Sequence, residues 1–98
     1  MMPSLAEALA GISRIRPALA ERGVTQIGVF GSVARGTARS DSDVDCLIEL
    51  SDDRDLLDLI AVKRLLEAEL HCSVDVVSKR GLKPDIREEV LREVRYAA

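Results

Sequence analysis

Apolar residues recur at helical spacing over the first part of the chain, at Leu5, Ala8, Leu9, Ile12, Ile15 and Leu19. Ser4 and Glu7 have the spacing of a capping box at the start of this stretch. Gly23 follows it, and glycine commonly ends a helix. The pattern therefore predicts one helix between Ser4 and Gly23.

Two segments that favour strands come next. The first runs from Val24 to Phe30 and ends at a Gly31-Ser32 turn. A short helix is expected at residues 33–35 and a polar loop at residues 37–42. The second segment runs from Val44 to Leu50, and its side chains alternate between two faces. One face carries Val44, Cys46 and Ile48, and the other carries Asp43, Asp45 and Glu49.

The second half of the chain repeats the alternation of helix and strand. A helix is expected over residues 55–70 with Asp52 or Asp53 as its cap, then a strand over residues 72–77 and a turn over residues 78–81. The last helix is expected over residues 85–94, after Pro84. This order predicts an α/β (α+β) fold, a small mixed sheet flanked by helices that lie mainly on one face. The other face is then free to carry chemistry.

Composition narrows the class of protein. Hydrophobic residues make up 47 % of the 98 residues and charged residues 32 %, which is typical of one globular domain. Aromatic residues are only 2 %, so Leu, Val, Ile and Ala must form the core. The net charge of −3 argues against general nucleic-acid binding.

The lack of targeting signals and the use of cysteine predict a cytoplasmic protein. No apolar run reaches membrane-spanning length, and the N-terminus lacks the apolar region of a signal peptide. Cys46 and Cys72 fall in predicted strands, and we expect them to be reduced core residues. His71 is the only histidine, which excludes a metal site built from several histidines.

Three aspartates are candidates for a metal site. Asp43 and Asp45 share a strand face, and Asp75 interrupts the apolar run Val74-Asp75-Val76-Val77. A buried carboxylate without a partner is costly, because desolvation disfavours its charged form. If the two strands are neighbours, the three carboxylates together suit magnesium. Taken singly, each has a simpler explanation: Asp43 as a turn residue, Asp45 as an edge residue, and Asp75 as the partner of an arginine.

The motif Gly31-Ser32-Val33-Ala34-Arg35-Gly36, followed by Asp43-Val44-Asp45 and the in-strand Asp75, resembles the signature of the polymerase-β-type nucleotidyltransferase superfamily. The short length and the charged segment over residues 82–93 resemble its minimal, MntA-like antitoxin group. The resemblance covers nearly the whole chain, so residues 1–98 are expected to form a single minimal nucleotidyltransferase domain.

The resemblance implies a role for each matching residue. Gly31 and Ser32 would hold the β- and γ-phosphates of a nucleoside triphosphate. Asp43 and Asp45 would bind both of two catalytic Mg²⁺ ions, and Asp75 would bind the ion nearest the acceptor and help to deprotonate its hydroxyl. Arg35 lies within the motif and would contact phosphate, although a solvated arginine is an equal alternative.

The resemblance also implies a co-substrate and a partner. ATP would supply AMP, and the acceptor would be a tyrosine hydroxyl of a HEPN-domain (HepT-like) toxin that the modification neutralises, as in a type VII-like antitoxin. The expected core fold leaves no residues for an acceptor-binding domain, so a second protein is expected to supply much of the acceptor surface or to be the acceptor itself, in a homo- or hetero-oligomer. Two alternatives stay open: an antitoxin that acts by binding alone, and a nucleotidyltransferase for a small molecule.

The sequence also contains a basic turn after the third predicted strand, formed by Lys79, Arg80 and Lys83. Such a turn can contact nucleotide or partner, but solvated charges are its simpler explanation.

Overall fold

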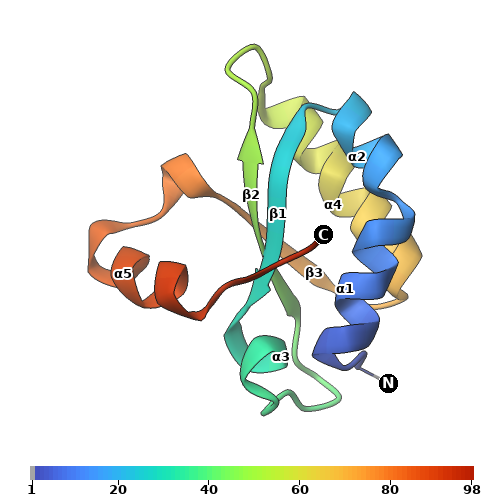
Figure 1. Cartoon of the computed structure of the whole chain (residues 1–98), viewed down its shortest axis with the longest axis vertical. Helices are drawn as coiled ribbons and strands as arrows, with labels where there is room; N and C mark the ends of the chain where they lie inside the picture. Colours follow the sequence, from blue (N-terminus) through green and yellow to red (C-terminus); the bar gives the residue numbers. More distant parts are fainter. Residues whose placement is uncertain (1) are drawn as a thin grey trace.

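A four-stranded mixed sheet forms the centre of the computed structural model, which describes residues 2–98 (Figure 1). The strands are β1 (Val24–Phe30), β2 (Val44–Leu50), β3 (Val74–Ser78) and β4 (Arg95–Tyr96). The helices are α1 (Leu5–Arg14), α2 (Arg16–Glu21), α3 (Gly31–Arg35), α4 (Leu56–Leu70) and α5 (Pro84–Glu93), with a 3-10 turn η1 (Lys79–Gly81). The strand order is β3-β2-β1-β4, and only β2 and β3 pair in parallel. The predicted mixed sheet flanked by helices is confirmed.

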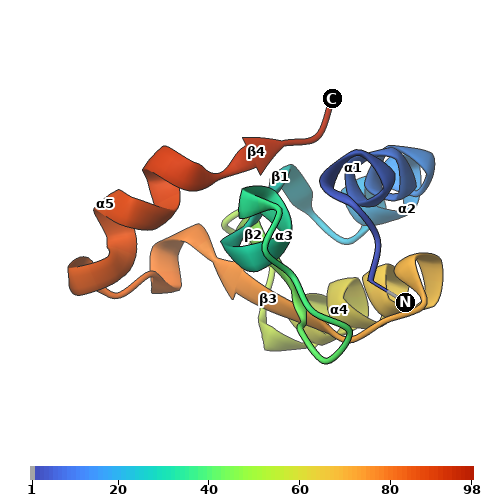
Figure 2. The ribbon, with the colours of Figure 1, turned by 90° about the horizontal axis from the view of Figure 1, so that it is seen from below.

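Three helices, α1, α2 and α4, cover one face of the sheet (Figure 2). Fully buried side chains join these helices to the strands, among them Ile12, Leu19, Ile27, Ile48 and Leu66. Burial of one such side chain stabilises the fold by about 1.5–3 kcal/mol relative to leaving it exposed. The core therefore consists of aliphatic side chains, as the low aromatic content predicts.

Helix α5 lies on the opposite face and covers only its middle. Leu47 of β2 packs there in a smaller cluster with Leu82, Val90 and Val94. Leu47 lies between Asp45 and Glu49 on the same face of β2, because alternate residues of a strand share a face. Asp45 and Glu49 therefore lie outside this cluster, toward opposite ends of β2.

The structure corrects three of the predicted element boundaries. The first helix is interrupted at Ile15, because Pro17 in the first turn of α2 has no N–H to donate and its ring opposes a continuous helix. The cap of α4 is Asp55 instead of Asp52 or Asp53, and its carboxylate accepts hydrogen bonds from the amides of Leu57 and Asp58 at 3.0 and 3.4 Å. The short helix α3 begins at Gly31, two residues earlier than expected.

The third strand begins later than predicted, and a fourth strand was not predicted. Helix α4 ends at Leu70 and is capped by His71, whose φ of 55° is in the left-handed region. The strand β3 starts only at Val74, so Cys72 lies outside it. Cys46 is a buried core residue, as expected, and its burial raises the pKa of the thiol to about 12. The short β4 pairs with β1 opposite Gly28 and Val29, and two residues are too few to give a strand pattern in sequence.

The capping box predicted at the N-terminus is present. Ser4 Oγ accepts a hydrogen bond from the Glu7 amide at 3.1 Å, and Glu7 Oε1 accepts one from the Ser4 amide at 2.9 Å. None of the helices in residues 2–98 combines the length and the apolar character that crossing a bilayer requires.

Candidate functional site

Two of the candidate aspartates lie side by side on adjacent strands. The parallel pairing of β2 and β3 places Val44 opposite Val74 and Asp45 opposite Asp75. The valines face the helix-covered core, so the aspartates face the other side of the sheet. Asp43 lies just before β2 and is exposed. The strands that carry Asp45 and Asp75 are therefore neighbours, as a shared metal site requires.

Asp45 is the aspartate most affected by its surroundings. Its side chain is half-buried, and burial raises its pKa above the ordinary value, because loss of hydration disfavours the charged form. The negative charges of Asp75 and Asp43 raise the pKa of Asp45 further, and the positive charge of Arg35 lowers it. Asp43, Asp45 and Asp75 therefore form one acidic site, in which negative charge exceeds positive charge.

The Gly31-Ser32 turn lies directly against this acidic site. Gly31 has a φ of +74°, a backbone conformation that residues other than glycine rarely adopt. A Cβ added to Gly31 would overlap Oδ2 of Asp45 and would lie 3.0 Å from its Cγ. Ser32 follows as the second residue of α3 and is half-buried. The structure thus brings together the turn and the aspartate that the sequence separates by fourteen residues.

The donor set of the acidic site fits a hard divalent cation. It contains only carboxylate oxygens, which are the ligands that Mg²⁺ prefers, and after burial the charges of Asp75 and Asp43 are the next causes that raise the pKa of Asp45. In residues 2–98, no three or more His, Cys, Asp or Glu side chains are arranged to hold a metal ion. Like charges favour side-chain positions that keep the carboxylates apart, and a cation between them would remove that repulsion.

Arg35 is at the edge of the same site and is paired with a residue that sequence reasoning missed. Its Nη1 lies 2.5 Å from Oε1 of Glu93, the last residue of α5. The arginine side chain is 53 % exposed and that of the glutamate 17 %. Glu93 also raises the pKa of Asp45, so it belongs to the electrostatic surroundings of the acidic site. No sequence signal identifies Glu93, because it lies 58 residues from its partner and occupies an ordinary helical position.

The acidic site is open rather than enclosed. Asp43 and Asp75 are exposed and Asp45 is half-buried, and Asp43 also lines a cavity of about 240 Å³. A cavity of about 360 Å³ lies at the other end of the sheet, around Thr25, Glu49 and Ser78. The carboxylates therefore lie on a surface that a large acceptor can approach.

Comparison with known protein families identifies the family of this chain. Residues 12–97 match the family model described as nucleotidyltransferase domain. The chain belongs to the nucleotidyltransferase domain family. The resemblance stated from the Gly31-Ser32 turn and the three aspartates is confirmed at the level of the family, and the chain is a nucleotidyltransferase.

Individual relatives agree with this assignment. The chain is 50 % identical over 74 residues to the protein adenylyltransferase MntA of Thermococcus cleftensis. The aligned region covers 76 % of this chain and 75 % of the relative. It is 44 % identical to a protein of known structure proposed to be a minimal nucleotidyltransferase, with a TM-score of 0.83 and 95 % of each chain covered.

A third comparison concerns an assembly. The chain superposes with a TM-score of 0.65 and 19 % identity on a chain in the complex of a tri-AMPylated HEPN toxin with an MNT antitoxin from Shewanella oneidensis, covering 91 % of this nucleotidyltransferase and 70 % of the other chain. At this identity the likeness shows a shared fold.

Proposed function

We propose that this nucleotidyltransferase is a Mg²⁺-dependent protein adenylyltransferase that transfers AMP from ATP to a tyrosine hydroxyl of a HEPN-type toxin and so acts as an antitoxin. The observation that carries the proposal is the placement of Asp45 opposite Asp75, beside the Gly31 turn, on an open face of the sheet. The relative that is 50 % identical and bears the name protein adenylyltransferase supports the transfer of AMP to a protein. The complex with an AMPylated HEPN toxin supports the class of partner.

Each site residue then has a role in the reaction. Gly31 and Ser32 would hold the β- and γ-phosphates. Only a residue without a Cβ at position 31 lets this turn lie so close to Asp45. Asp43, Asp45 and Asp75 would hold the cations. When bound, Mg²⁺ neutralises charge on the phosphates and lowers the pKa of the acceptor hydroxyl.

The transfer itself forms one bond and breaks one. The acceptor oxygen bonds to the α-phosphorus, and the bond from that phosphorus to the bridging oxygen of the β-phosphate breaks, so pyrophosphate leaves. Asp75 is exposed, whereas Asp45 is half-buried, so Asp75 faces the side from which the acceptor comes. Its carboxylate accepts the proton of the hydroxyl.

Arg35 would bind the triphosphate after exchanging Glu93 for a phosphate oxygen. A hydrogen bond to a charged group contributes about 1.5–3 kcal/mol, so Arg35→Ala is expected to weaken ATP binding by roughly ten- to a hundred-fold. Glu93→Gln leaves the arginine in place and removes one negative charge near Asp45, so ATP should bind equally well or more tightly. Calorimetric titration of both variants with ATP and Mg²⁺ makes the comparison. Equal ATP affinity in Arg35→Ala and the unaltered chain would show that Arg35 is only a surface residue.

The proposed transfer is tested by intact mass spectrometry of a HEPN-domain protein chosen as the candidate partner. After incubation with the chain, Mg²⁺ and each of the four nucleoside triphosphates in turn, we expect a mass gain of one or more AMP groups with ATP. The gain should be absent with Asp43→Asn, which removes one of the proposed cation ligands. A stable complex without any mass gain would contradict the proposal and would favour an antitoxin that acts by binding alone.

A further inference from the structure

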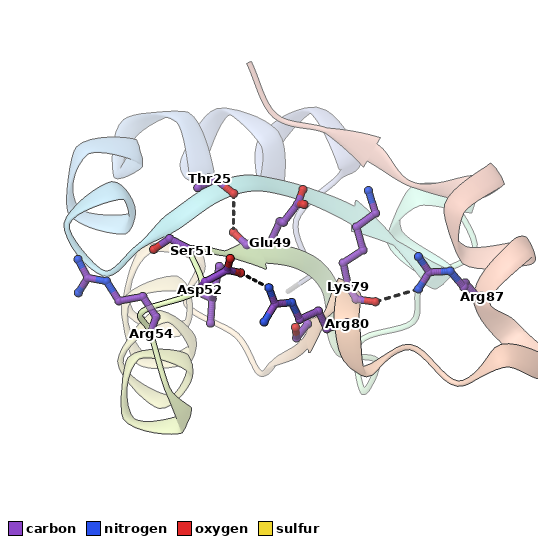
Figure 3. A pocket seen from close by; sticks show the side chains of 10 residues that line it. Thr25, Glu49, Ser51, Asp52, Arg54, Lys79, Arg80 and Arg87 are labelled. Carbon is purple, nitrogen blue, oxygen red and sulfur yellow. Dashed lines mark hydrogen bonds and ion pairs between the residues drawn. The ribbon is translucent and has the colours of Figure 1, made fainter.

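A basic pocket lies on the same face of the sheet as the acidic site, at the opposite end of β2 (Figure 3). Glu49, one of the residues that line it, shares a strand face with Asp45. Four residues separate the two, which corresponds to about 13 Å along a strand. Leu47 and the cluster beneath α5 lie between the two sites.

The pocket has an excess of positive charge. Its volume is about 360 Å³, and its lining includes four basic side chains, from Arg54, Lys79, Arg80 and Arg87, and two acidic ones, from Glu49 and Asp52. These residues come from the end of β2 and the loop after it, from η1 and from α5. Tertiary structure thus adds Arg54 and Arg87 to the basic turn seen in the sequence.

Three of the basic groups can bind an incoming anion. Lys79 and Arg87 form no ion pair within residues 2–98. Arg80 pairs with Asp52, but the two side chains are 75 % and 86 % exposed. An exposed pair of this kind contributes about 0–1 kcal/mol, so exchanging the partner costs little. Arg54, in contrast, is held by Asp53 and Asp58.

One hydrogen bond joins the side chain of Arg87 to the main chain of Lys79. Arg87 Nη1 donates a hydrogen bond to the main-chain oxygen of Lys79 at 3.1 Å, which joins α5 to η1 (Figure 3). A guanidinium has five N–H donors, so Arg87 keeps donors for a ligand. An ammonium and a guanidinium that line one pocket suit carboxylate or phosphate oxygens.

We propose that the basic pocket binds an acidic segment of the acceptor protein, while the hydroxyl to be modified lies at the acidic site. This inference rests on the proposed function, because it takes the acceptor to be a protein. An extended segment spans about 13 Å in four residues, so the acidic side chains would lie about that far from the acceptor tyrosine in the bound partner. Opposite charges at the two ends of one face orient the partner, since charge complementarity sets register and association rate.

Charge on the rest of this face favours a protein ligand over a nucleic acid. A continuous polyanion leaving the pocket along β2 would meet Asp45 and its two neighbouring aspartates, and the chain has a net charge of −3. Separate carboxylates on a folded partner can engage the pocket and avoid the acidic site. The ligand is therefore taken to be carboxylates of the partner.

The test uses the candidate HEPN-domain partner and two pairs of charge reversals. Lys79→Glu/Arg87→Glu alters the pocket, and Lys63→Glu/Arg64→Glu makes the same change in charge on exposed positions of α4, across the sheet. We expect the partner Kd, measured by calorimetry without nucleotide, to rise about ten-fold for the pocket variant and less than about two-fold for the control. The Kd for ATP should be unchanged in both variants.

A milder variant guards against misfolding, because Arg87 also joins α5 to η1. Lys79→Gln/Arg87→Gln should raise the partner Kd by about three-fold. Added salt should reduce the difference in Kd between this variant and the unaltered chain. Partner binding equal to that of the unaltered chain in both pocket variants would overturn the proposal, as would an equal loss in the α4 control. Absence of a complex between the unaltered chain and the HEPN protein would also overturn it.

Two further outcomes separate the alternatives. If the unaltered chain binds the partner but transfers no AMP, the proposed function fails, and the partner Kd of the pocket variants still tests the pocket. If a fluorescein-labelled single-stranded RNA binds the unaltered chain and loses affinity in the pocket variants, while partner binding stays constant, the pocket is a nucleic-acid site and the proposal is wrong.

Discussion

Replacing Asp45 by Asn is expected to abolish AMP transfer without destabilising the fold. Loss of a cation ligand at the centre of the acidic site removes several kcal/mol of transition-state stabilisation, which corresponds to roughly a thousand-fold or more in kcat. The same change removes a charge that the folded chain tolerates poorly, since burial and two neighbouring carboxylates raise the pKa of Asp45. The metal-free variant should therefore have a Tm equal to or above that of the unaltered chain.

The pH dependence of stability gives a second readout for Asp45. A carboxyl whose pKa is raised in the folded state binds its proton more tightly there than in the unfolded chain. The stability that protonated Asp45 contributes to the metal-free protein should accordingly be lost as pH rises from the ordinary value of 3.8 through the raised pKa of Asp45. In Asp45→Asn this loss should be smaller, and thermal melting across that pH range measures the difference.

Cation binding can be measured apart from activity. A ligand that binds only the folded chain raises its Tm, so Mg²⁺ should raise the Tm of the unaltered chain more than that of Asp45→Asn. Asp41→Asn is the matched control, because Asp41 is an exposed aspartate in the loop before β2 and has no proposed role. Full AMP transfer by Asp45→Asn, or an equal loss in Asp41→Asn, would contradict the assignment of the acidic site.

Replacing Gly31 by Ala is expected to cost both stability and transfer. The φ of +74° makes any side chain unfavourable by about 1–2 kcal/mol. The added Cβ would also overlap the Asp45 carboxylate and displace it. A displacement of about 1 Å at a reacting centre costs roughly a hundred-fold in rate, so kcat should fall by at least that factor.

Gly36 supplies the control that separates backbone strain from displacement. It has a φ of +76°, and a Cβ added there has nothing within 4 Å. Gly36→Ala should lower the Tm by about as much as the backbone strain in Gly31→Ala does, but kcat for AMP transfer should stay within about three-fold, because no site residue moves. Comparable losses of transfer in the two variants would show that the close approach of Gly31 to Asp45 has no functional weight.

Local patterns predicted much of this molecule because they depend on backbone geometry alone. The period of two in β2 assigned Val44, Cys46 and Ile48 to the core and Asp45 to the other face. The Ser4–Glu7 capping box was readable because its hydrogen bonds join residues three apart. The break at Ile15 was also readable in principle, since Pro17 carries its physical cause.

Contacts between distant segments could not be predicted in the same way. The pairing of Arg35 with Glu93 depends on where α5 packs, and the basic pocket depends on the approach of η1 and α5 to the end of β2. Strand β4 exists only because the chain after α5 returns to the edge of β1. Each of these features comes from burial of Leu82, Val90 and Val94 against the sheet, and no short-range signal specifies that position.

The sequence by itself determined the residues of the acidic site and the strand face on which Asp45 lies, because side-chain alternation and turn chemistry act over a few residues. Only the tertiary structure decided that β3 lies parallel to β2 with Asp75 opposite Asp45, and that Gly31 lies against that carboxylate. The physical reason is that strand pairing is chosen by the burial of whole apolar faces, here those beneath α1, α2 and α4. That choice is a property of the complete core, and it placed the acidic site on the face opposite these helices.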